Sequence, residues 1–503
     1  MSDIKNIVVS ENATQIEKFA AKEFSKYLSI ITGEKIEVKV VYDKDSVHIG
    51  CLPDQPNLAH KEYLNNELSE LHQDGFIIRD LGENIIIGGK TPRATLYGVY
   101  KYLELLGTRW YFPGKENEFV PRRQEVYLRN INLKESPEFA HRSVVIYFSG
   151  NEINNWIDFA AKTKLNAIHI HSDEGIDKIS ELLAERGLEF NIRRHFFGDT
   201  YSSENKTNLE ESRSLLIDYV NKLPREINDF FLWPADVKLK MNDTASELSM
   251  SDLVLMFTNE MAEAVQAVRP GSKMSFLAYW STWEVPKKVT PSNNVFLEIA
   301  PMFRCFSHAV NDQSCKINSG EIFPVFEGLA EIFDISESHI LEYWLDASLF
   351  GRGKFNGLNG RLPQFGEIIR QDLKYYRSKG IKNISTFAVG LDEDYFSKYT
   401  SPTVYQYPAL LWNLDTDLNS ELASFCKNYY GDSSISEFFQ MTDQIDPTDT
   451  TPDKWKDNIE RLEDYKNFLK EVKPNDEIHL NRLGRLMREL DHVIKWMCDV
   501  KIE

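Results

Sequence analysis

The sequence KMSFLAYWSTWEVPKKVTPSNNVFLEIA occupies residues 273–300 and contains two apolar runs of strand length, Lys273–Trp280 and Asn294–Ala300. Short apolar runs bounded by turn residues are typical of buried strands in a parallel sheet. The segment between them, Trp283–Asn293, is a proline-containing loop with no helical pattern. We therefore expect two adjacent parallel strands here, joined without the usual covering helix.

Similar runs recur outward in both directions from this pair, and most are separated by a long helical pattern such as Met250–Val268. Eight such runs predict an α/β chain whose core is a (β/α)8 TIM barrel, with one helix of the outer ring missing or reduced. The other six strand candidates are Ser143–Ser149, Leu165–His171, Leu188–Arg193, Asp229–Pro234, His339–Asp346 and Asn383–Gly390.

The barrel is flanked by two regions with different patterns. Residues 1–135 alternate short strands with two helices, which predicts a small α+β domain. Residues 136–431 would form the barrel. Residues 432–503 carry leucines and aromatics at helical spacing, which predicts a helical extension of two packed helices.

The composition excludes several classes of partner. The 503 residues include 58 Lys and Arg against 77 Asp and Glu, for a net charge of −19, and such a surface repels nucleic acid and anionic lipid. We find no run of about 18 apolar residues and no apolar leader in Met1–Val9, so we expect a soluble cytoplasmic protein. Five scattered cysteines predict reduced thiols, and we expect no cofactor and no metal site at Cys305 and Cys315.

The residues that follow the predicted strands are strongly aromatic and polar. In a (β/α)8 barrel the carboxyl ends of the strands form the active site. Aromatic rings cover the apolar faces of sugars, so this face predicts an oligosaccharide or glycan as the substrate. The residues that we expect to bind it are His171, Arg194, His195, Trp233, Tyr279, Trp280, Arg304, His308, Tyr343 and Trp344.

Carboxylates at the same strand ends are the candidate catalytic groups, because glycosidic cleavage uses a pair of them. Asp392 and Glu393 rank first, since an adjacent Asp-Glu pair suits hydrolysis assisted by a 2-acetamido group; a solvated acidic loop is the alternative. Asp236 follows strand four and ranks second, and Glu342 lies inside strand seven. A second pair, Asp173-Glu174, fits a helix start better than a catalytic role.

The first domain resembles the non-catalytic amino-terminal domain of family 20 hexosaminidases and family 67 α-glucuronidases. The segments that carry this resemblance are Ala20–Phe24, Val47–Gly50, Asp74–Phe76, Thr91–Tyr100 and Leu106–Pro113.

The barrel resembles the group of glycoside hydrolases that contains family 163, β-N-acetylglucosaminidases acting on N-glycans. Its segments are Ile299–His308, Cys315 with Asn318, Glu342–Trp344, Leu410–Asn413 with Asp417, and Tyr429–Gly431.

These resemblances imply a glycoside hydrolase that cleaves an N-acetylhexosamine-containing glycan by substrate-assisted hydrolysis with retention. Family 20 enzymes place their Asp-Glu pair at strand four, where this chain has Ala235-Asp236-Val237, so those roles do not transfer directly. Two alternatives stay open. One is a hydrolase of uronic acid glycosides, with Arg194 or Arg304 binding the sugar carboxylate. The other is a carbohydrate-binding barrel without catalysis.

Overall fold

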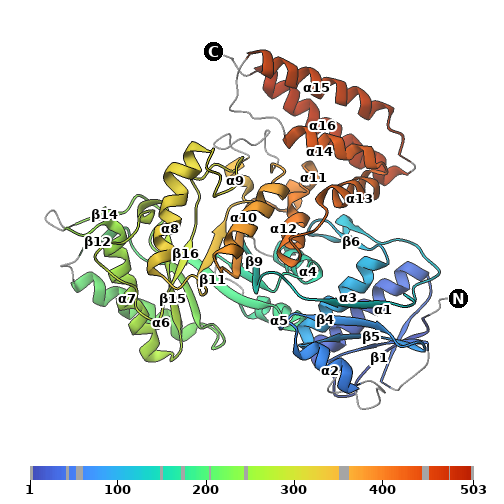
Figure 1. The fold of residues 1–503 in the computed structure, drawn as a ribbon, viewed down its shortest axis with the longest axis horizontal. Coiled ribbons are helices and arrows are strands. Elements are labelled where there is room, and N and C mark those ends of the chain that lie inside the picture. Colours follow the sequence, from blue (N-terminus) through green and yellow to red (C-terminus); the bar gives the residue numbers. More distant parts are fainter. Residues whose placement is uncertain are drawn as a thin grey trace.

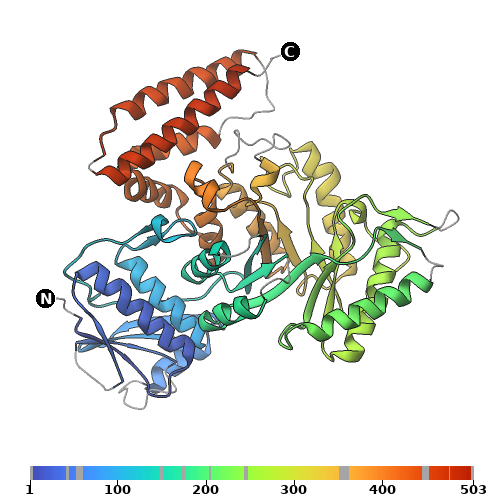
Figure 2. The same ribbon diagram turned by 180° about the vertical axis from the view of Figure 1, so that it is seen from behind.

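The computed structural model describes residues 4–40, 45–51, 61–147, 151–171, 176–202, 206–242, 247–350, 362–443, 452–474 and 476–499. Figures 1 and 2 show three parts: an amino-terminal α/β unit, a central barrel and a group of carboxyl-terminal helices.

The central unit is a closed barrel of eight parallel strands, which confirms the predicted fold class. β18 pairs with β9 to close the ring, with Ser385 opposite Ser143. The strands, in their order around the barrel, are β9 (His141–Ile146), β10 (Ala167–Ile170), β11 (Glu189–His195), β13 (Asp229–Trp233), β15 (Lys273–Ala278), β16 (Val295–Ile299), β17 (His339–Glu342) and β18 (Asn383–Ala388).

Helices cover the outside of the barrel in the expected alternation. Residues 403–430 form two helices instead of one continuous helix, because Asn413–Thr416 forms a turn and Asp417 caps the second helix by accepting a hydrogen bond from the Ser420 amide. The principal barrel helices are α4 (Asn151–Lys162), α5 (Ile176–Arg186), α6 (Lys206–Lys222), α7 (Met250–Val268), α8 (Phe323–Ile332), α10 (Gly366–Ser378), α12 (Thr403–Trp412) and α13 (Leu418–Tyr430).

The connection between β15 and β16 lacks a long helix, as the sequence predicted, and contains only the 3₁₀ turn η3 (Trp280–Thr282). The rest of this connection is fixed to α7. Asp252, in the first turn of α7, accepts hydrogen bonds through Oδ1 from the backbone amides of Lys287, Lys288 and Val289 at 2.8–3.0 Å. A side chain of the preceding helix, α7, therefore holds the loop that stands in place of the missing helix.

The amino-terminal unit is a six-stranded mixed sheet in the order β2-β1-β3-β5-β4-β8. Helices α1 (Gln15–Thr32) and α3 (Pro92–Leu105) pack in the main core, while α2 (Lys61–Ser69) forms a separate small core with Ile77 and Ile86. The strands are β1 (Asn6–Val9), β2 (Glu37–Lys39), β3 (Ser46–Ile49), β4 (Phe76–Asp80), β5 (Asn84–Gly89) and β8 (Asn132–Glu135).

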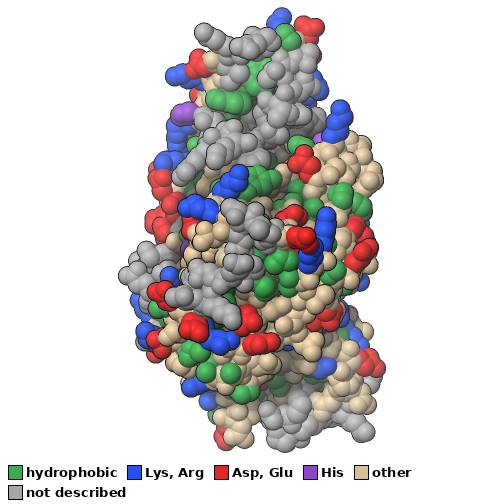
Figure 3. All heavy atoms as spheres, turned by 90° about the vertical axis from the view of Figure 1, so that its left-hand side faces the viewer, with side chains coloured by type: hydrophobic (Ala, Val, Ile, Leu, Met, Phe, Trp, Pro, Cys, Tyr) green, Lys and Arg blue, Asp and Glu red, His purple; other side chains and the backbone are tan. Residues whose placement is uncertain are grey.

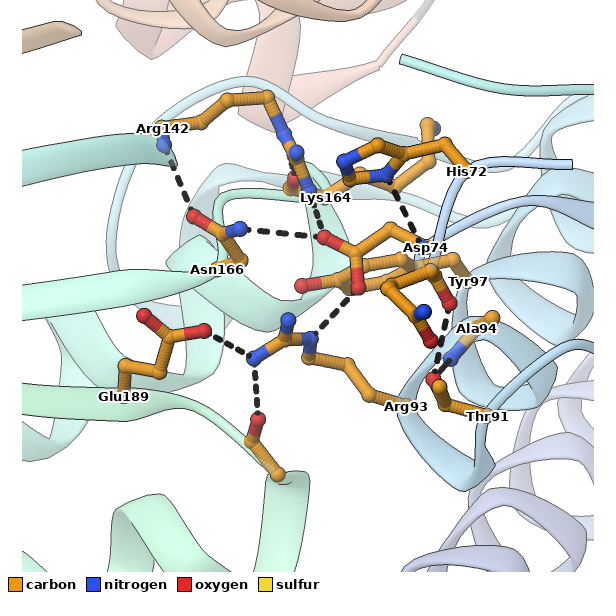
Figure 4. Close-up of polar contacts among 12 residues, drawn as sticks. His72, Asp74, Thr91, Arg93, Ala94, Tyr97, Arg142, Lys164, Asn166 and Glu189 are labelled. Atoms are coloured by element: carbon orange, nitrogen blue, oxygen red, sulfur yellow. Dashed lines mark hydrogen bonds and ion pairs between the residues drawn. The ribbon is translucent and has the colours of Figure 1, made fainter. Parts of the chain in front are cut away.

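A buried ionic cluster joins this unit to the amino-terminal end of the barrel, and Figure 4 shows it. Asp74 is fully buried and accepts hydrogen bonds from Arg93 Nε at 2.8 Å, Arg142 Nη2 at 2.8 Å and Asn166 Nδ2 at 3.1 Å. Arg142 belongs to β9, and Asn166 directly precedes β10. A carboxylate of the first unit is thus the counterion of a guanidinium inside the barrel wall.

The carboxyl-terminal region contains α14 (Ser436–Asp443) and two long helices, α15 (Pro452–Glu471) and α16 (Glu477–Asp499). The long helices pack together, with Trp455 Nε1 donating to the Met497 carbonyl at 2.9 Å. Arg482 of α16 lies over the Tyr429 ring of α13, 3.8 Å from its centroid. Its Nη2 donates to the Glu116 carbonyl at 2.6 Å, so α16 contacts both the barrel and the first unit.

Acidic and basic side chains are interspersed on the face of the molecule shown in Figure 3. Within the described ranges, no helix combines the length and the apolar character needed to cross a membrane.

Candidate active site

A cavity of about 290 Å³ opens at the carboxyl ends of the barrel strands, close to the lower end of the range for small-molecule sites. Residues at the ends of seven of the eight strands contribute to its wall. The described lining residues are Tyr147, His195, Trp233, Asp236, Leu277, Tyr279, Met302, Leu341, Tyr343, Asp346, Ser348, Leu349, Phe387 and Val389.

Two carboxylates line this cavity. Asp236 follows β13 and is exposed, and Tyr279 Oη donates a hydrogen bond to its Oδ1 at 3.0 Å. Asp346 follows β17 and is buried, with a relative exposure of 6%. Its Oδ1 accepts hydrogen bonds from the Ser348 amide at 2.9 Å and from the Ser348 hydroxyl at 2.6 Å. These contacts fix the orientation of Asp346 within the wall.

Two tyrosines experience both of these charges. Partial burial raises the pKa of Tyr279 and of Tyr147 above the ordinary value, and the negative charges of Asp236 and Asp346 raise both further. Both phenols therefore stay protonated at neutral pH and can donate hydrogen bonds. Both carboxylates line the same cavity, so each phenol lies in the field of both.

Aromatic rings form another part of the wall. Tyr147 stacks on His171, with ring centroids 4.1 Å apart, and His195 lies 5.2 Å from the Trp233 ring. Tyr343 packs against Phe387 at 5.2 Å. Burial, and then the neighbouring His195, lower the pKa of His171 to about 4, so this imidazole is neutral at physiological pH. The wall thus offers rings and uncharged polar groups.

A buried ion pair in the barrel interior holds the Trp233 indole. Its Nε1 donates to Glu298 Oε2 at 2.7 Å, and Arg193 Nη1 donates to Glu298 Oε1 at 2.6 Å. Arg193 Nε also donates to His169 Nδ1 at 2.9 Å. Glu298 and Arg193 are fully buried in the barrel interior, so the orientation of the indole is set by the barrel core.

A strained aromatic residue follows Tyr279. Trp280 has a φ of +38°, in the left-handed region that bulky side chains rarely adopt, and 42% of its surface is exposed. Its ring lies 6.3 Å from that of Phe303, which is also exposed. The 3₁₀ turn that replaces the missing helix thus places an exposed indole next to the pocket.

Comparisons with known proteins agree with this architecture. Residues 1–102 match the family described as the glycosyl hydrolase family 67 N-terminus, and residues 234–440 match a domain of unknown function, DUF4838. The chain thus has a TIM-barrel fold preceded by a domain similar to the family 67 N-terminus. The family 67 match confirms the resemblance of the first domain; the family 163 resemblance stays a prediction. No curated protein matches the sequence.

Three solved structures illustrate the likeness. A family GH115 4-O-methyl-α-glucuronidase, BtGH115A, with specificity for decorated arabinogalactans, is 9% identical, covers 98% of this chain and 72% of its own, and has a TM-score of 0.68. CpGH84D is 12% identical, covers 99% of this chain and 85% of its own, and has a TM-score of 0.55. A β-N-acetylhexosaminidase from Bacteroides fragilis is 11% identical, covers 88% of this chain and 92% of its own, and has a TM-score of 0.52. At these identities, the likeness is one of fold.

The structure brings five of the predicted site residues into the pocket wall: His195, Trp233, Asp236, Tyr279 and Tyr343. His171 and Trp280 each lie against a lining residue, since His171 stacks on Tyr147 and Trp280 adjoins Tyr279.

The first-ranked catalytic pair lies elsewhere. Asp392 is the N-cap of α11 (Glu393–Lys398) and accepts a hydrogen bond from the Tyr395 amide at 2.7 Å. Glu393 is an exposed residue in the first turn of this helix. Neither residue is among those described as lining the pocket. Both take positions that acidic residues favour at a helix start for structural reasons.

Three other predicted residues form part of a buried cluster outside the pocket. Arg304 Nη1 donates to Glu342 Oε1 and to Asp372 Oδ2, each at 2.7 Å, and Trp344 Nε1 donates to the same Asp372 oxygen at 3.3 Å. All four side chains are fully buried. Asp372 comes from α10, so this cluster ties that helix to β17 and to the loop after β16.

Arg194 and His308 also lie away from the described wall. Arg194 lies over the ring of Tyr219 on α6, 5.6 Å from its centroid, which places it on the outer side of the barrel. His308 is exposed and lies beside Cys305. The pair Asp173-Glu174 falls outside the described residues.

The site residues selected from the sequence leave out several lining residues, above all Tyr147, Met302, Asp346, Ser348 and Phe387. A signal was available for two of them. Asp346 is the last residue of the seventh predicted strand, and Tyr147 lies near the end of the first. The rule that strand ends form the site therefore applied to both, but neither carried a motif that singled it out.

Proposed function

We propose that this protein is a glycoside hydrolase and that the cavity at the barrel mouth is its active site. The observation that carries the proposal is the placement of two carboxylates, Asp236 and Asp346, in one aromatic-lined pocket at the carboxyl ends of the strands. A pair of carboxylates flanking a sugar is what hydrolysis of a glycosidic bond requires.

The two carboxylates suit different roles. Asp236 is exposed and would protonate the leaving oxygen, whose aglycone would extend toward solvent. Asp346 is buried and held by Ser348, so it would act on the enclosed sugar, either on its 2-acetamido group or on its anomeric carbon. The phenols of Tyr279 and Tyr147 would donate hydrogen bonds to the negative charge that develops on the leaving oxygen.

The described wall favours a neutral sugar. It includes two carboxylates and no lysine or arginine. The arginines considered for binding a uronic acid are engaged elsewhere: Arg304 is paired with Glu342 and Asp372, and Arg194 lies over Tyr219. A sugar carboxylate in this pocket would meet like charges, which costs binding energy. An N-acetylhexosaminide has no charge and offers an amide that the phenols and Asp346 can bind.

The first test is hydrolysis of a panel of aryl β-N-acetylglucosaminides, β-N-acetylgalactosaminides and α-glucuronides. Turnover of an acetamido sugar, with inhibition by a thiazoline, would support substrate-assisted hydrolysis. Turnover of the glucuronide alone would replace this proposal by the uronic acid alternative. Binding of acetamido sugars without any turnover would indicate a non-catalytic barrel.

Two variants then locate the acid. Asp236→Asn should lower kcat by about 10²–10⁴-fold, as expected for loss of a general acid. Glu393→Gln is the matched control because Glu393 is an exposed carboxylate in the first turn of α11, outside the described wall. Full activity of Asp236→Asn together with an inactive Glu393→Gln would transfer the acid role to the Asp392-Glu393 pair.

A further inference from the structure

Three potential metal ligands converge in the segment that follows β16. Cys305, His308 and Cys315 each offer one ligand atom, and these atoms all lie within 4.8 Å of one another. Cys305 Sγ is 3.2 Å from His308 Nδ1. Both cysteines are free thiols. The spacing Cys-x2-His-x6-Cys is compact, so one loop supplies all three groups.

This loop is held in shape by a buried asparagine. Asn318, at the start of the π-helix η4 (Asn318–Ile322), is fully buried. Its Nδ2 donates to the carbonyls of Cys305, His308 and Ala309 at 2.9–3.2 Å, and its Oδ1 accepts from the Cys305 amide at 2.8 Å. One side chain thereby fixes the backbone of two of the three potential ligands.

The second support is the buried cluster around Arg304. Arg304 Nη2 donates to the His308 carbonyl at 2.8 Å, while the same guanidinium is paired with Asp372 and Glu342. The backbone at His308 is therefore held from two sides. Such outer contacts, which orient ligands before a metal binds, are typical of metal sites in proteins.

The sequence alone predicts no metal site at Cys305 and Cys315, but the fold places His308 beside both thiols. We propose that these three residues bind a zinc ion. Two thiolates and one imidazole nitrogen are ligands that Zn²⁺ prefers, and two thiolates neutralise its charge. Zn–S bonds of about 2.3 Å and a Zn–N bond of about 2.0 Å bring tetrahedral ligand atoms to separations of roughly 3.5–3.8 Å, so the observed cluster needs only small side-chain shifts.

The fourth ligand of this zinc ion would be a water molecule. His308 is exposed and Cys305 is half-buried, whereas Cys315 is 7% exposed, so one side of the cluster faces solvent. A disulfide between the cysteines is the competing use of these thiols, but it gives no role to the imidazole nitrogen beside Cys305 Sγ.

The site would fasten the loop that reaches the pocket. Met302, three residues before Cys305, lines the cavity, and its Sδ lies 3.4 Å from Tyr279 Oη. The zinc ion would thus hold the backbone between β16 and η4. This inference is independent of the proposed enzymatic activity because it concerns metal content and stability.

The test is the zinc content of the purified full-length protein, measured by plasma mass spectrometry after dialysis against a metal-free buffer. We expect roughly one Zn²⁺ per chain in the unmodified protein and near zero in Cys315→Ser and in His308→Ala. Cys498→Ser is the matched control because Cys498 is an exposed thiol on α16. It should retain the metal.

Cobalt substitution of the unmodified protein gives a second readout that needs no variant to fold. Co²⁺ bound by two thiolates should produce thiolate-to-cobalt absorption in the near ultraviolet and tetrahedral bands in the visible, and added Zn²⁺ should abolish both. Removal of the metal by a chelator should lower Tm.

Two results would overturn the zinc proposal. One is a protein mass two hydrogens lower than that of the reduced chain, with Cys305 and Cys315 in one disulfide-linked peptide. The other is a folded protein with free thiols that retains neither Zn²⁺ nor Co²⁺ after dialysis.

Discussion

The carboxylates at the two ends of the barrel have different hydrogen-bond partners. At the amino-terminal end, Asp74 is fully buried and contacts two guanidinium groups and an amide (Figure 4). At the carboxyl-terminal end, Asp236 is exposed and accepts a hydrogen bond from one phenol, while Asp346 is oriented by Ser348. Both ends thus hold acidic side chains, but beside different strands of the barrel.

This difference distinguishes carboxylates that stabilise the fold from carboxylates that can take part in a reaction. A buried carboxylate whose charge is matched by arginines is fixed in one protonation state and one position, which suits an interface. A carboxylate that faces a cavity beside a phenol can exchange a proton with a ligand. The partners of an acidic residue, more than its burial or its place at a strand end, thus indicate its role.

The largest expected effect on stability is at the amino-terminal end. Asp74→Asn removes the charge that compensates the fully buried Arg142, and breaking a buried ion pair in this way costs about 3–5 kcal/mol. The control is Glu337→Gln, which removes an exposed pair with Lys273 and should cost at most about 1 kcal/mol. Urea denaturation measures both, and equal midpoints would contradict a special role for the interface cluster.

At the other end, Asp346→Asn should act on catalysis instead of stability. We expect kcat to fall about 10²–10³-fold, or roughly 3–4 kcal/mol of transition-state stabilisation, with Tm close to that of the unmodified protein. Steady-state kinetics and a thermal melt on the same preparation make the comparison. A large fall in Tm with normal kcat would place Asp346 among the structural carboxylates.

The pH dependence of stability should also reveal the amino-terminal cluster. Burial alone raises the pKa of Asp74, but Arg142 and Arg93 outweigh this and hold it below the ordinary value. The stabilisation by ionised Asp74 is therefore complete above the pKa of an aspartate in the unfolded chain, about 3.9. It is lost as the pH falls from that value through the lower pKa of Asp74 in the folded protein. Below about pH 4, the free energy of unfolding should fall more steeply for the unmodified protein than for Asp74→Asn. Parallel curves would refute this.

A smaller effect is expected from the phenol that contacts Asp236. Tyr279→Phe keeps the ring and removes the hydrogen bond to Asp236 Oδ1, which should lower kcat/KM about tenfold, or 1.4 kcal/mol. Tyr375→Phe is the matched control, because it removes a phenol that donates to Glu327 outside the described pocket wall. Activity of Tyr279→Phe equal to that of the control would remove Tyr279 from the mechanism.

The smallest effect concerns the rim. Trp280→Ala removes an exposed indole next to the pocket and should raise KM about 2–10-fold with little change in kcat, as expected for a lost sugar-stacking surface. Phe468→Ala on α15 removes a similarly exposed ring from another part of the molecule and should leave KM unchanged. A KM that stays constant in both variants would exclude Trp280 as a sugar platform.

Much of the barrel was predictable because buried parallel strands leave continuous apolar runs. The eight strands, and the missing helix after Lys273–Trp280, follow from local composition alone. Part of the pocket followed from the strand-end rule, which found Trp233, Asp236 and Tyr279.

The remaining assignments depend on contacts between distant segments. An adjacent Asp-Glu pair has the same local signature at a helix start as in a catalytic site, and only the structure shows that Asp392 caps α11. The sequence around Arg304 and Glu342 also fits a functional site. Their pairing with Asp372, which comes from a later helix, is visible only in the structure.

The interface around Asp74 also constrains how this protein can evolve. The gene segment for the barrel encodes a buried cation, and the segment for the first domain encodes its counterion. Recombination that transfers the barrel without its amino-terminal partner would leave Arg142 unneutralised in a dry environment. The two segments are therefore expected to be inherited as one unit, and a chimera would need a donor domain that supplies an acidic residue at this point.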